Sequence, residues 1–290
     1  MSVKPPSFDR LTGLVREMYG EDAKLTDAPQ AGVVGALDPK DRLERTTAGK
    51  KTSRVLGAAK TEDLAFRQRV VDAGYALAAG GASFSGHWSS DRVNKTLWTL
   101  GYGGRMQVRK FLPNGELGKP SAALRDIFEN GQHYGFECAT AMMVIYHKAL
   151  LEHLGDEKFD ALFSHPKMLA FFRWDIEDDD YAKVKKLSMD PKLEGKAPVP
   201  GSHYYFKNPD AAPENSAFRG ENVMYLGDGK YYAHGVVGAS GTYVVTEVEI
   251  MKTLSALRSP GSTVKPFRVA MEMHLDGLAV SKLAVPQLPV

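Results

Sequence analysis

The segment from Phe136 to Leu154 reads FECATAMMVIYHKALLEHL and is the most apolar helix that the sequence predicts. Apolar residues occur around its whole circumference, which is typical of a helix buried on all sides. Gly155 follows directly, as expected at the end of a helix. We therefore expect this helix to lie inside the protein, packed on a sheet formed by other segments.

The other expected elements lie on both sides of this helix along the chain. Upstream, Thr61 and an acidic first turn predict a helix that ends at Gly80. Pro120 begins a short helix at residues 120 to 128. Helices that precede an antiparallel sheet predict an α+β fold. Strand patterns occupy residues 96–100, 106–111, 203–207, 222–227, 230–237, 242–246 and 267–274, and a last helix lies near residues 249–257.

Composition divides the chain into two parts. Of the 290 residues, 43% are hydrophobic, which is enough for a sizeable core. Residues 1–60 are rich in Pro, Gly, Lys, Asp and Thr and show little apolar periodicity. We interpret them as a loosely structured N-terminal extension, and residues 61–290 as one catalytic domain.

Charge and cysteine content narrow the function classes. Lys and Arg number 37 and Asp and Glu 35, for a net charge of +2 without a dense basic stripe, so no nucleic-acid partner is expected. No apolar run approaches the roughly 18 residues needed to span a bilayer, so no membrane insertion is expected. The N-terminus lacks the apolar core of a signal peptide, and one cysteine excludes an intramolecular disulfide. These features predict a cytoplasmic protein.

Cys138 is the candidate nucleophile, because it lies in the first turn of the buried helix. Free N–H groups and the positive end of the helix dipole meet there, and both lower the pKa of a thiol. Backbone N–H groups in the same place can stabilise the oxyanion of an acyl-transfer intermediate. The alternative is a cysteine that serves only as a small buried hydrophobic residue.

A predicted hairpin supplies a carboxylate and an imidazole. Asp228 and Gly229 form its tight turn. A regular register then places His234 opposite Val223, with Glu221 one diagonal step away on the same face. The two side chains would share a substrate, although such a pair also occurs in protein cores. A bulge in the hairpin would invalidate this register.

Several neighbours of Cys138 have two possible roles each. Glu137 is either a second acid or base, or a cap of the helix start. Tyr134, Trp174 and Phe218 are aromatic residues that either line a substrate channel or belong to the core. His147 lies about half a turn around the helix from Cys138 and therefore cannot be its base.

No metal or other cofactor is expected. His147 and His153 are on different faces of the predicted helix, so they are a poor ligand pair. The acidic run at residues 177–180 lacks the glycine and the ligand spacing of a calcium loop.

Five phrases of the sequence, taken in order, resemble a known family, the Bacillus spore-coat protein-glutamine gamma-glutamyltransferases. The resemblance covers roughly residues 62 to 280 and implies a papain-like core of the NlpC/P60 type. It also implies an enzyme that links glutamine to lysine side chains of proteins without calcium. The phrases are RDIFENG (125–131), FECATA (136–141), YFKNP (205–209), RGENV (219–223) and YAHG (232–235).

The resemblance also implies roles for individual residues. Cys138 matches the nucleophile, Glu221 its principal acid/base partner, and Glu137 a partly redundant second carboxylate. His234 matches a nearby histidine. By the same likeness, Trp174 and Phe218 line a hydrophobic tunnel, and the family usually has tryptophan where Phe218 stands.

Two segments depart from the family, and two other functions stay open. Residues 1–60 have no counterpart, and the loop at about residues 176–200 is longer than expected. Association with a spore coat, and a link to sporulation, follow from the resemblance alone. The alternatives are a cysteine peptidase or amidase of the NlpC/P60 type and a non-catalytic coat-associated module.

Overall fold

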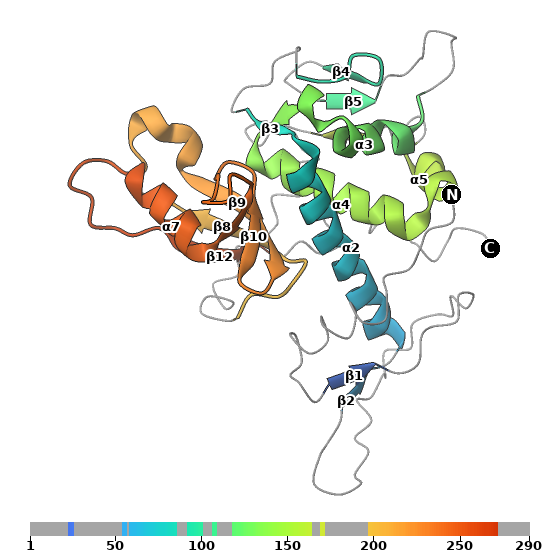
Figure 1. Cartoon of the computed structure of the whole chain (residues 1–290), viewed down its shortest axis with the longest axis horizontal. Coiled ribbons are helices and arrows are strands. Elements are labelled where there is room, and N and C mark those ends of the chain that lie inside the picture. The colour runs from blue at the N-terminus through green and yellow to red at the C-terminus, as the bar shows by residue number, and fades with distance from the viewer. Residues whose placement is uncertain are drawn as a thin grey trace, which may run out of the picture.

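The computed structural model describes residues 23–25, 54–56, 58–85, 92–100, 106–108, 118–163, 169–171 and 197–271. Helices pack against an antiparallel sheet, so the expected α+β class is confirmed (Figure 1). The helices are α2 (Ala58–Gly80), α3 (Pro120–Glu129), α4 (Cys138–Leu154), α5 (Asp156–Leu162) and α7 (Glu247–Ala256).

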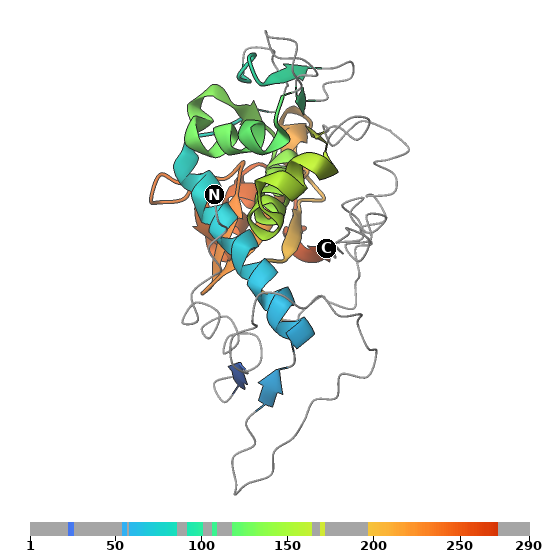
Figure 2. The same cartoon turned by 90° about the vertical axis from the view of Figure 1, so that its right-hand side faces the viewer.

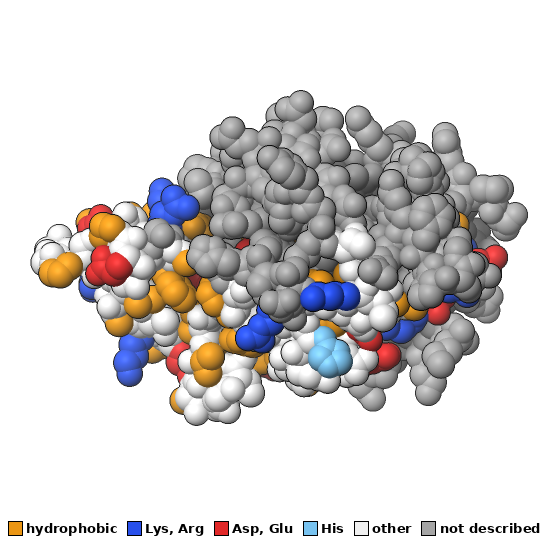
Figure 3. Space-filling model, turned by 90° about the horizontal axis from the view of Figure 1, so that it is seen from above, with side chains coloured by type: hydrophobic (Ala, Val, Ile, Leu, Met, Phe, Trp, Pro, Cys, Tyr) orange, Lys and Arg blue, Asp and Glu red, His pale blue; other side chains and the backbone are white. Residues whose placement is uncertain are grey.

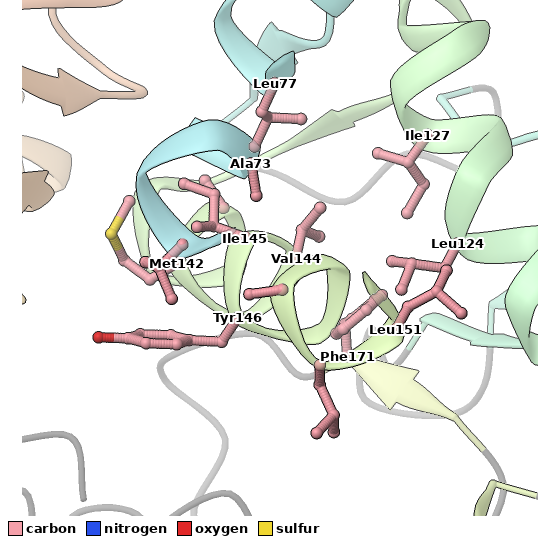
Figure 4. Packing of buried hydrophobic residues seen from close by; sticks show 14 of the residues in the cluster. Ala73, Leu77, Leu124, Ile127, Met142, Val144, Ile145, Tyr146, Leu151 and Phe171 are labelled. Atoms are coloured by element: carbon pink, nitrogen blue, oxygen red, sulfur yellow. The ribbon is translucent and has the colours of Figure 1, made fainter. Parts of the chain in front are cut away.

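The central helix is α4, as its apolar sequence predicts. It begins at Cys138 and ends before Gly155, which adopts a φ of 78°. Figure 4 shows side chains of α2 (Ala73 and Leu77) and of α3 (Leu124 and Ile127) directed toward α4. The other helices thus bury α4. This packing fixes the position of the start of α4.

The start of α2 differs from its prediction. The helix ends at Gly80, as expected, and Gly81 follows with a φ of 82°. It begins at Ala58, three residues before the predicted Thr61 cap. Two short strands, β1 (Ala23–Leu25) and β2 (Arg54–Leu56), pair in parallel and lie beyond this end of α2 (Figure 2).

The main sheet has five strands in the order β11-β10-β9-β8-β12. One face, with Met224, Leu226 and Tyr232, packs on α2 and α4, and the opposite face, with Val223 and Tyr225, packs on α7. The sheet therefore lies between two helical layers. Its strands are β8 (His203–Lys207), β9 (Gly220–Gly227), β10 (Lys230–Ala233), β11 (Val244–Thr246) and β12 (Phe267–Met271).

The β9–β10 hairpin contains a bulge that changes its register. Lys230 pairs with Gly227, but Tyr231 pairs with Tyr225 and Ala233 with Val223. The predicted pairing of His234 with Val223 is therefore wrong by one residue. Because side chains alternate across a strand, this step reverses which of them share a face.

Two further sets of short strands lie outside the main sheet. β3 (Ser83–Phe84) pairs in parallel with β6 (Gly135–Phe136), the segment that leads into α4. A small antiparallel sheet contains β4 (Trp98–Leu100), β5 (Met106–Val108) and β7 (Ala170–Phe171). None of the described helices is both long and apolar enough to cross a membrane.

Candidate active site

Cys138 occupies the first position of α4, immediately after β6. The strand pair β3–β6 fixes the approach to this position, since Ser85 N–H donates to Phe136 O over 2.9 Å. The side chain of Cys138 is buried, with 9% of its surface exposed. The sulfur is thus held at a defined point between the helix and the sheet.

Strand β9 brings two side chains to the sulfur. Asn222 Nδ2–H donates to Cys138 Sγ over 3.3 Å. The carboxyl group of Glu221 is near enough for its charge to raise the pKa of the Cys138 thiol. The structure therefore unites Cys138 and Glu221, the nucleophile and the carboxylate that the sequence singles out.

The Glu221 carboxyl group is held in a nonpolar place. Only 1% of the residue is exposed, and Gly235 N–H donates to Oε1 over 2.8 Å. The pKa of Glu221 is raised from 4.5 to about 8, mainly by burial and also by the negative charge of Glu137, while the Gly235 hydrogen bond and the Cys138 thiol oppose the rise. Near neutral pH, this group can both accept and release a proton, as an acid/base residue must.

The pKa of the Cys138 thiol is raised, so the expectation of a lowered value is wrong. Burial is the largest cause, and the negative charges of Glu221 and Glu137 add to it, while the hydrogen bond from Asn222 opposes them. The N–H groups at the start of α4, which were expected to stabilise a thiolate, have another partner. A thiolate at this site therefore requires that a proton leave for a neighbouring base.

That other partner is Glu137, which caps α4. Its carboxylate accepts from Ala139 N–H over 2.5 Å, from Thr140 N–H over 3.0 Å and from Thr140 Oγ1–H over 2.5 Å. These contacts show the capping role that the sequence offered as one of two possibilities. Ala139 N–H, which was expected to stabilise an oxyanion, is bound to this carboxylate.

The two ring nitrogens of His234 bind groups other than the sulfur. Its Nδ1 lies 2.5 Å from Tyr232 Oη and its Nε2 lies 3.2 Å from Ser83 O, while its ring stacks on Phe136 with centroids 4.7 Å apart. Burial lowers the pKa of His234 to about 4. The imidazole is therefore neutral at physiological pH and supports β3 and β6.

The predicted aromatic residues have different surroundings. Phe218 packs against Phe84 with ring centroids 5.8 Å apart, and Phe84 is close to the turn at Gly235 that binds Glu221. Tyr134 is fully buried, and its hydroxyl donates to Asp126 Oδ2 over 2.5 Å, as in a core residue. Trp174 is outside the described residues.

Three further residues surround the site without having been predicted. Asn222 contacts the sulfur, His203 contacts Asn222, and the pKa of nearby Tyr205 is raised by burial and, to a smaller extent, by Cys138. Asn222 directly follows Glu221 in the sequence, and the alternation of side chains along a strand gives no reason to expect both at one site. In the part of the chain that the structure describes, no group of three or more His, Cys, Asp or Glu side chains could hold a metal ion.

Comparisons with known proteins agree with this arrangement. A family model described as "Protein-glutamine gamma-glutamyltransferase" matches residues 58–284. A protein of that name from Bacillus pumilus is 30% identical over 214 residues, which are 74% of this chain and 77% of the relative. The Bacillus subtilis protein of that name is 34% identical over 197 residues, 68% of this chain and 73% of the relative.

A solved structure shows the same fold. The transglutaminase from Geobacillus stearothermophilus, without its C-terminal extension, matches with a TM-score of 0.58 and 29% identity. The match covers 76% of this chain and 94% of the other. Its fold is papain-like, so the expected core is confirmed.

Fold, buried cysteine and relatives together define an acyltransferase. The chain belongs to the protein-glutamine gamma-glutamyltransferase family.

Proposed function

We propose that this protein joins glutamine to lysine side chains of proteins through a thioester at Cys138, and that it does so without calcium. The observation that carries the proposal is the buried pair of Cys138, which is the only cysteine of the chain, and the Glu221 carboxyl group, each of which changes the pKa of the other. The matched family, whose members carry this activity in their names, supports the same reaction.

The first half of the reaction forms the thioester. The thiol proton passes to the Glu221 carboxylate, and the sulfur attacks the γ-carboxamide carbon of glutamine. The carbon–nitrogen bond then breaks, and Glu221 returns the proton to the leaving nitrogen, which departs as ammonia. A raised carboxyl pKa suits both steps, because the group must take and give a proton near neutral pH.

The second half transfers the acyl group to lysine. A neutral ε-amine attacks the thioester carbon and gives one proton to Glu221. The carbon–sulfur bond breaks, and the sulfur recovers that proton as a thiol. The product is an isopeptide bond, and the enzyme returns to its starting state.

Two neighbouring groups assist in this proposal. Glu137 is close enough for its charge to raise the pKa values of both Cys138 and Glu221, so it can serve as a second carboxylate when Glu221 is absent. To do so it must give up part of its capping contacts, which makes it the weaker acid/base group. His234 acts indirectly, by supporting Phe136 just before the nucleophile.

Aromatic residues exclude water from the thioester in this proposal. Phe84 and Phe218 form a packed pair beside the Glu221 turn, and Trp174 is proposed to line the same channel. Water would hydrolyse the thioester and leave a deamidated glutamine instead of a cross-link.

Proteins are the proposed substrates, and neither nucleic acid nor insertion into a membrane is part of the function. On the face shown in Figure 3, Lys and Arg side chains of the described residues lie in separate groups among hydrophobic and uncharged surface. The relatives come from Bacillus species, which supports the further proposal of a protein made in the cytoplasm that joins a spore coat.

The test is incorporation of a labelled primary amine into casein with calcium chelated. Wild type is expected to incorporate the amine, and Cys138→Ala is expected to reduce incorporation to background. If wild type incorporates no amine but Cys138 still reacts with iodoacetamide, the peptidase or amidase function replaces this one. If Cys138 is also unreactive in the folded protein, the chain is a non-catalytic module.

A further inference from the structure

A chain of three buried side chains leads from the sulfur into the sheet. Asn222 Nδ2–H donates to Cys138 Sγ over 3.3 Å, and Asn222 Oδ1 lies 2.9 Å from His203 Nε2. Asn222 and His203 are each only 3% exposed. β8 and β9 are neighbours, and Asn222 lies one diagonal step from His203 on the sheet face that covers α4. The reaction steps described above do not use either residue.

The geometry determines which way the Asn222 amide points. With Nδ2 toward the sulfur, Oδ1 faces His203, so His203 Nε2 must carry the hydrogen. Reversing the amide would turn Nδ2–H toward His203, whose ring would then have to carry its hydrogen on the unpartnered Nδ1, and would leave the sulfur facing an oxygen. The buried imidazole therefore selects the amide orientation that presents a donor to the nucleophile.

The second nitrogen of His203 supports this assignment. His203 Nδ1 is buried and has no hydrogen-bond partner among the described residues. A protonated ring would place an N–H there without an acceptor, and burial accordingly lowers the pKa of His203 to about 4. The neutral ring with its hydrogen on Nε2 leaves only a weaker, unpaired acceptor.

We propose that Asn222 is a further catalytic residue, which donates its N–H to the Cys138 sulfur while that sulfur is a thiolate, and that His203 is the positioning residue that orients it. This inference rests on Cys138 being the nucleophile. Glu221 removes the proton and becomes neutral, but the negative charge of Glu137 still opposes the thiolate that forms. Asn222 supplies the opposing interaction: a donor without charge, already aimed at the sulfur, in a place that excludes water.

The thiol itself can report this role, because the chain contains one cysteine. The rate of iodoacetamide alkylation, measured from pH 6 to 10, follows the fraction of thiolate. Asn222→Asp and Asn222→Ala are expected to shift this profile to higher pH and to lower the rate at neutral pH by roughly 10- to 100-fold. Amine incorporation should fall by a similar factor. Thermal unfolding of each variant shows whether it is folded.

Substitutions at His203 test whether this residue acts through Asn222 or directly on the sulfur. His203→Ala is expected to lower the alkylation rate by roughly 3- to 10-fold, and His203→Gln, which keeps a donor near the Nε2 position, should restore most of it. When Asn222 is already alanine, His203→Ala should have little additional effect, because His203 acts only through Asn222. The matched control is His147→Gln, another buried histidine with a lowered pKa, about 4, which contacts Met143 O and not the site.

Two results would overturn the inference while leaving the proposed function intact. One is a folded Asn222→Ala protein with the alkylation profile and amine incorporation of wild type. The other is full additivity of the Asn222 and His203 substitutions. Failure of wild type to incorporate amine is a different result, which would refute the cross-linking function and not the contact between Asn222 and the thiol.

Discussion

At the scale of single residues, the sulfur of Cys138 is subject to opposing influences. Burial and two carboxylates favour the neutral thiol, and the Asn222 N–H favours the thiolate. With both pKa values raised, the thiol is protonated near neutral pH and the Glu221 carboxyl group is ionised in only part of the molecules. In the proposed reaction, the thiolate therefore forms when the thiol proton passes to an ionised Glu221.

Replacement of Glu221 tests whether Glu137 can substitute for it. Glu221→Gln is expected to lower amine incorporation by roughly 100-fold, because an acid/base group typically contributes a factor of 100 or more. The remaining activity should disappear in the double variant with Glu137→Gln. Rates are compared at equal concentrations of folded protein. Complete loss in Glu221→Gln alone would disprove the redundancy.

The raised pKa of Glu221 predicts how stability changes with pH. The folded state binds this proton more tightly than the unfolded state, whose carboxyl pKa is near 4.5. The contribution is fully present below about pH 4.5, decreases as pH rises, and is lost by about pH 8. It amounts to a few kcal/mol at most, on the order of 1.4 kcal/mol per pKa unit.

Urea unfolding of wild type and Glu221→Gln between pH 5 and 8 provides the measurement. The free energy of unfolding of wild type should decrease more steeply with pH, since glutamine cannot titrate. The same comparison in a Cys138→Ala background separates the effect of burial on the Glu221 pKa from the effect of the thiol. Parallel curves for both proteins would contradict the buried, raised carboxyl group.

At the scale of elements, the start of β9 positions the side chains of the site as much as the start of α4 does. A Cβ at Gly220 would lie 2.2 Å from Tyr205 Cζ, 2.3 Å from its hydroxyl and 2.6 Å from Phe206 O. The contact with a backbone oxygen cannot be relieved by turning a side chain. Gly220 therefore lets β8 and β9 approach closely where Glu221 and Asn222 follow.

Gly220→Ala is expected to displace Tyr205 and the start of β9. Overpacking of this kind typically lowers the free energy of unfolding by about 1–3 kcal/mol. Amine incorporation should fall by more than the loss of folded protein explains, since Glu221 and Asn222 move with the strand. Val248→Ala, at a position that is 75% exposed, is the control. Unchanged activity in folded Gly220→Ala would contradict the close approach.

Sequence patterns predicted most elements and part of the site. Glycines at positions 81 and 155 and Pro120 marked helix ends correctly, because such residues act locally. The hairpin register was predicted incorrectly, because a bulge between Lys230 and Tyr231 has no sequence signal as clear as a turn. Asn222 was missed for a related reason: a contact between β9 and α4 depends on packing over 84 positions of chain.

At the scale of the whole molecule, the site is formed where the helical layer meets the sheet. The thiol comes from α4, and the carboxyl and amide groups come from β9. α2 lies against the same strand, with Gly74 facing Leu226. Substitutions in this interface, at residues that take no part in the proposed reaction, therefore change the free energy of unfolding of the whole domain.

Gly74 and Leu226 form a pair that tests this interface. A Cβ at Gly74 would lie 2.6 Å from Leu226 Cδ2, so Gly74→Ala alone should cost about 1–3 kcal/mol of unfolding free energy. Leu226→Ala alone should cost about 2–5 kcal/mol through the cavity that it creates. In the double variant the new methyl group occupies part of that cavity, and alanine favours the helix more than glycine does.

The double variant should therefore be more stable than the sum of the single effects predicts, by about 1 kcal/mol or more. Denaturant unfolding of the four proteins gives this coupling. Cross-linking per folded molecule should stay near the wild-type value, because neither residue touches the thiol. Simple additivity would show that the two layers do not meet at this point.

The bulge in the β9–β10 hairpin has a consequence for insertions and deletions. The register that it sets brings Gly235, instead of Val236, opposite Glu221, and Gly235 provides the N–H that binds the carboxylate. The hairpin thus has a phase, much as a message has a reading frame. A residue added or lost between Tyr231 and Gly235 shifts that phase and separates Glu221 from its donor. A compensating change of one residue on the same arm restores the phase, although the sequence between the two changes is then different.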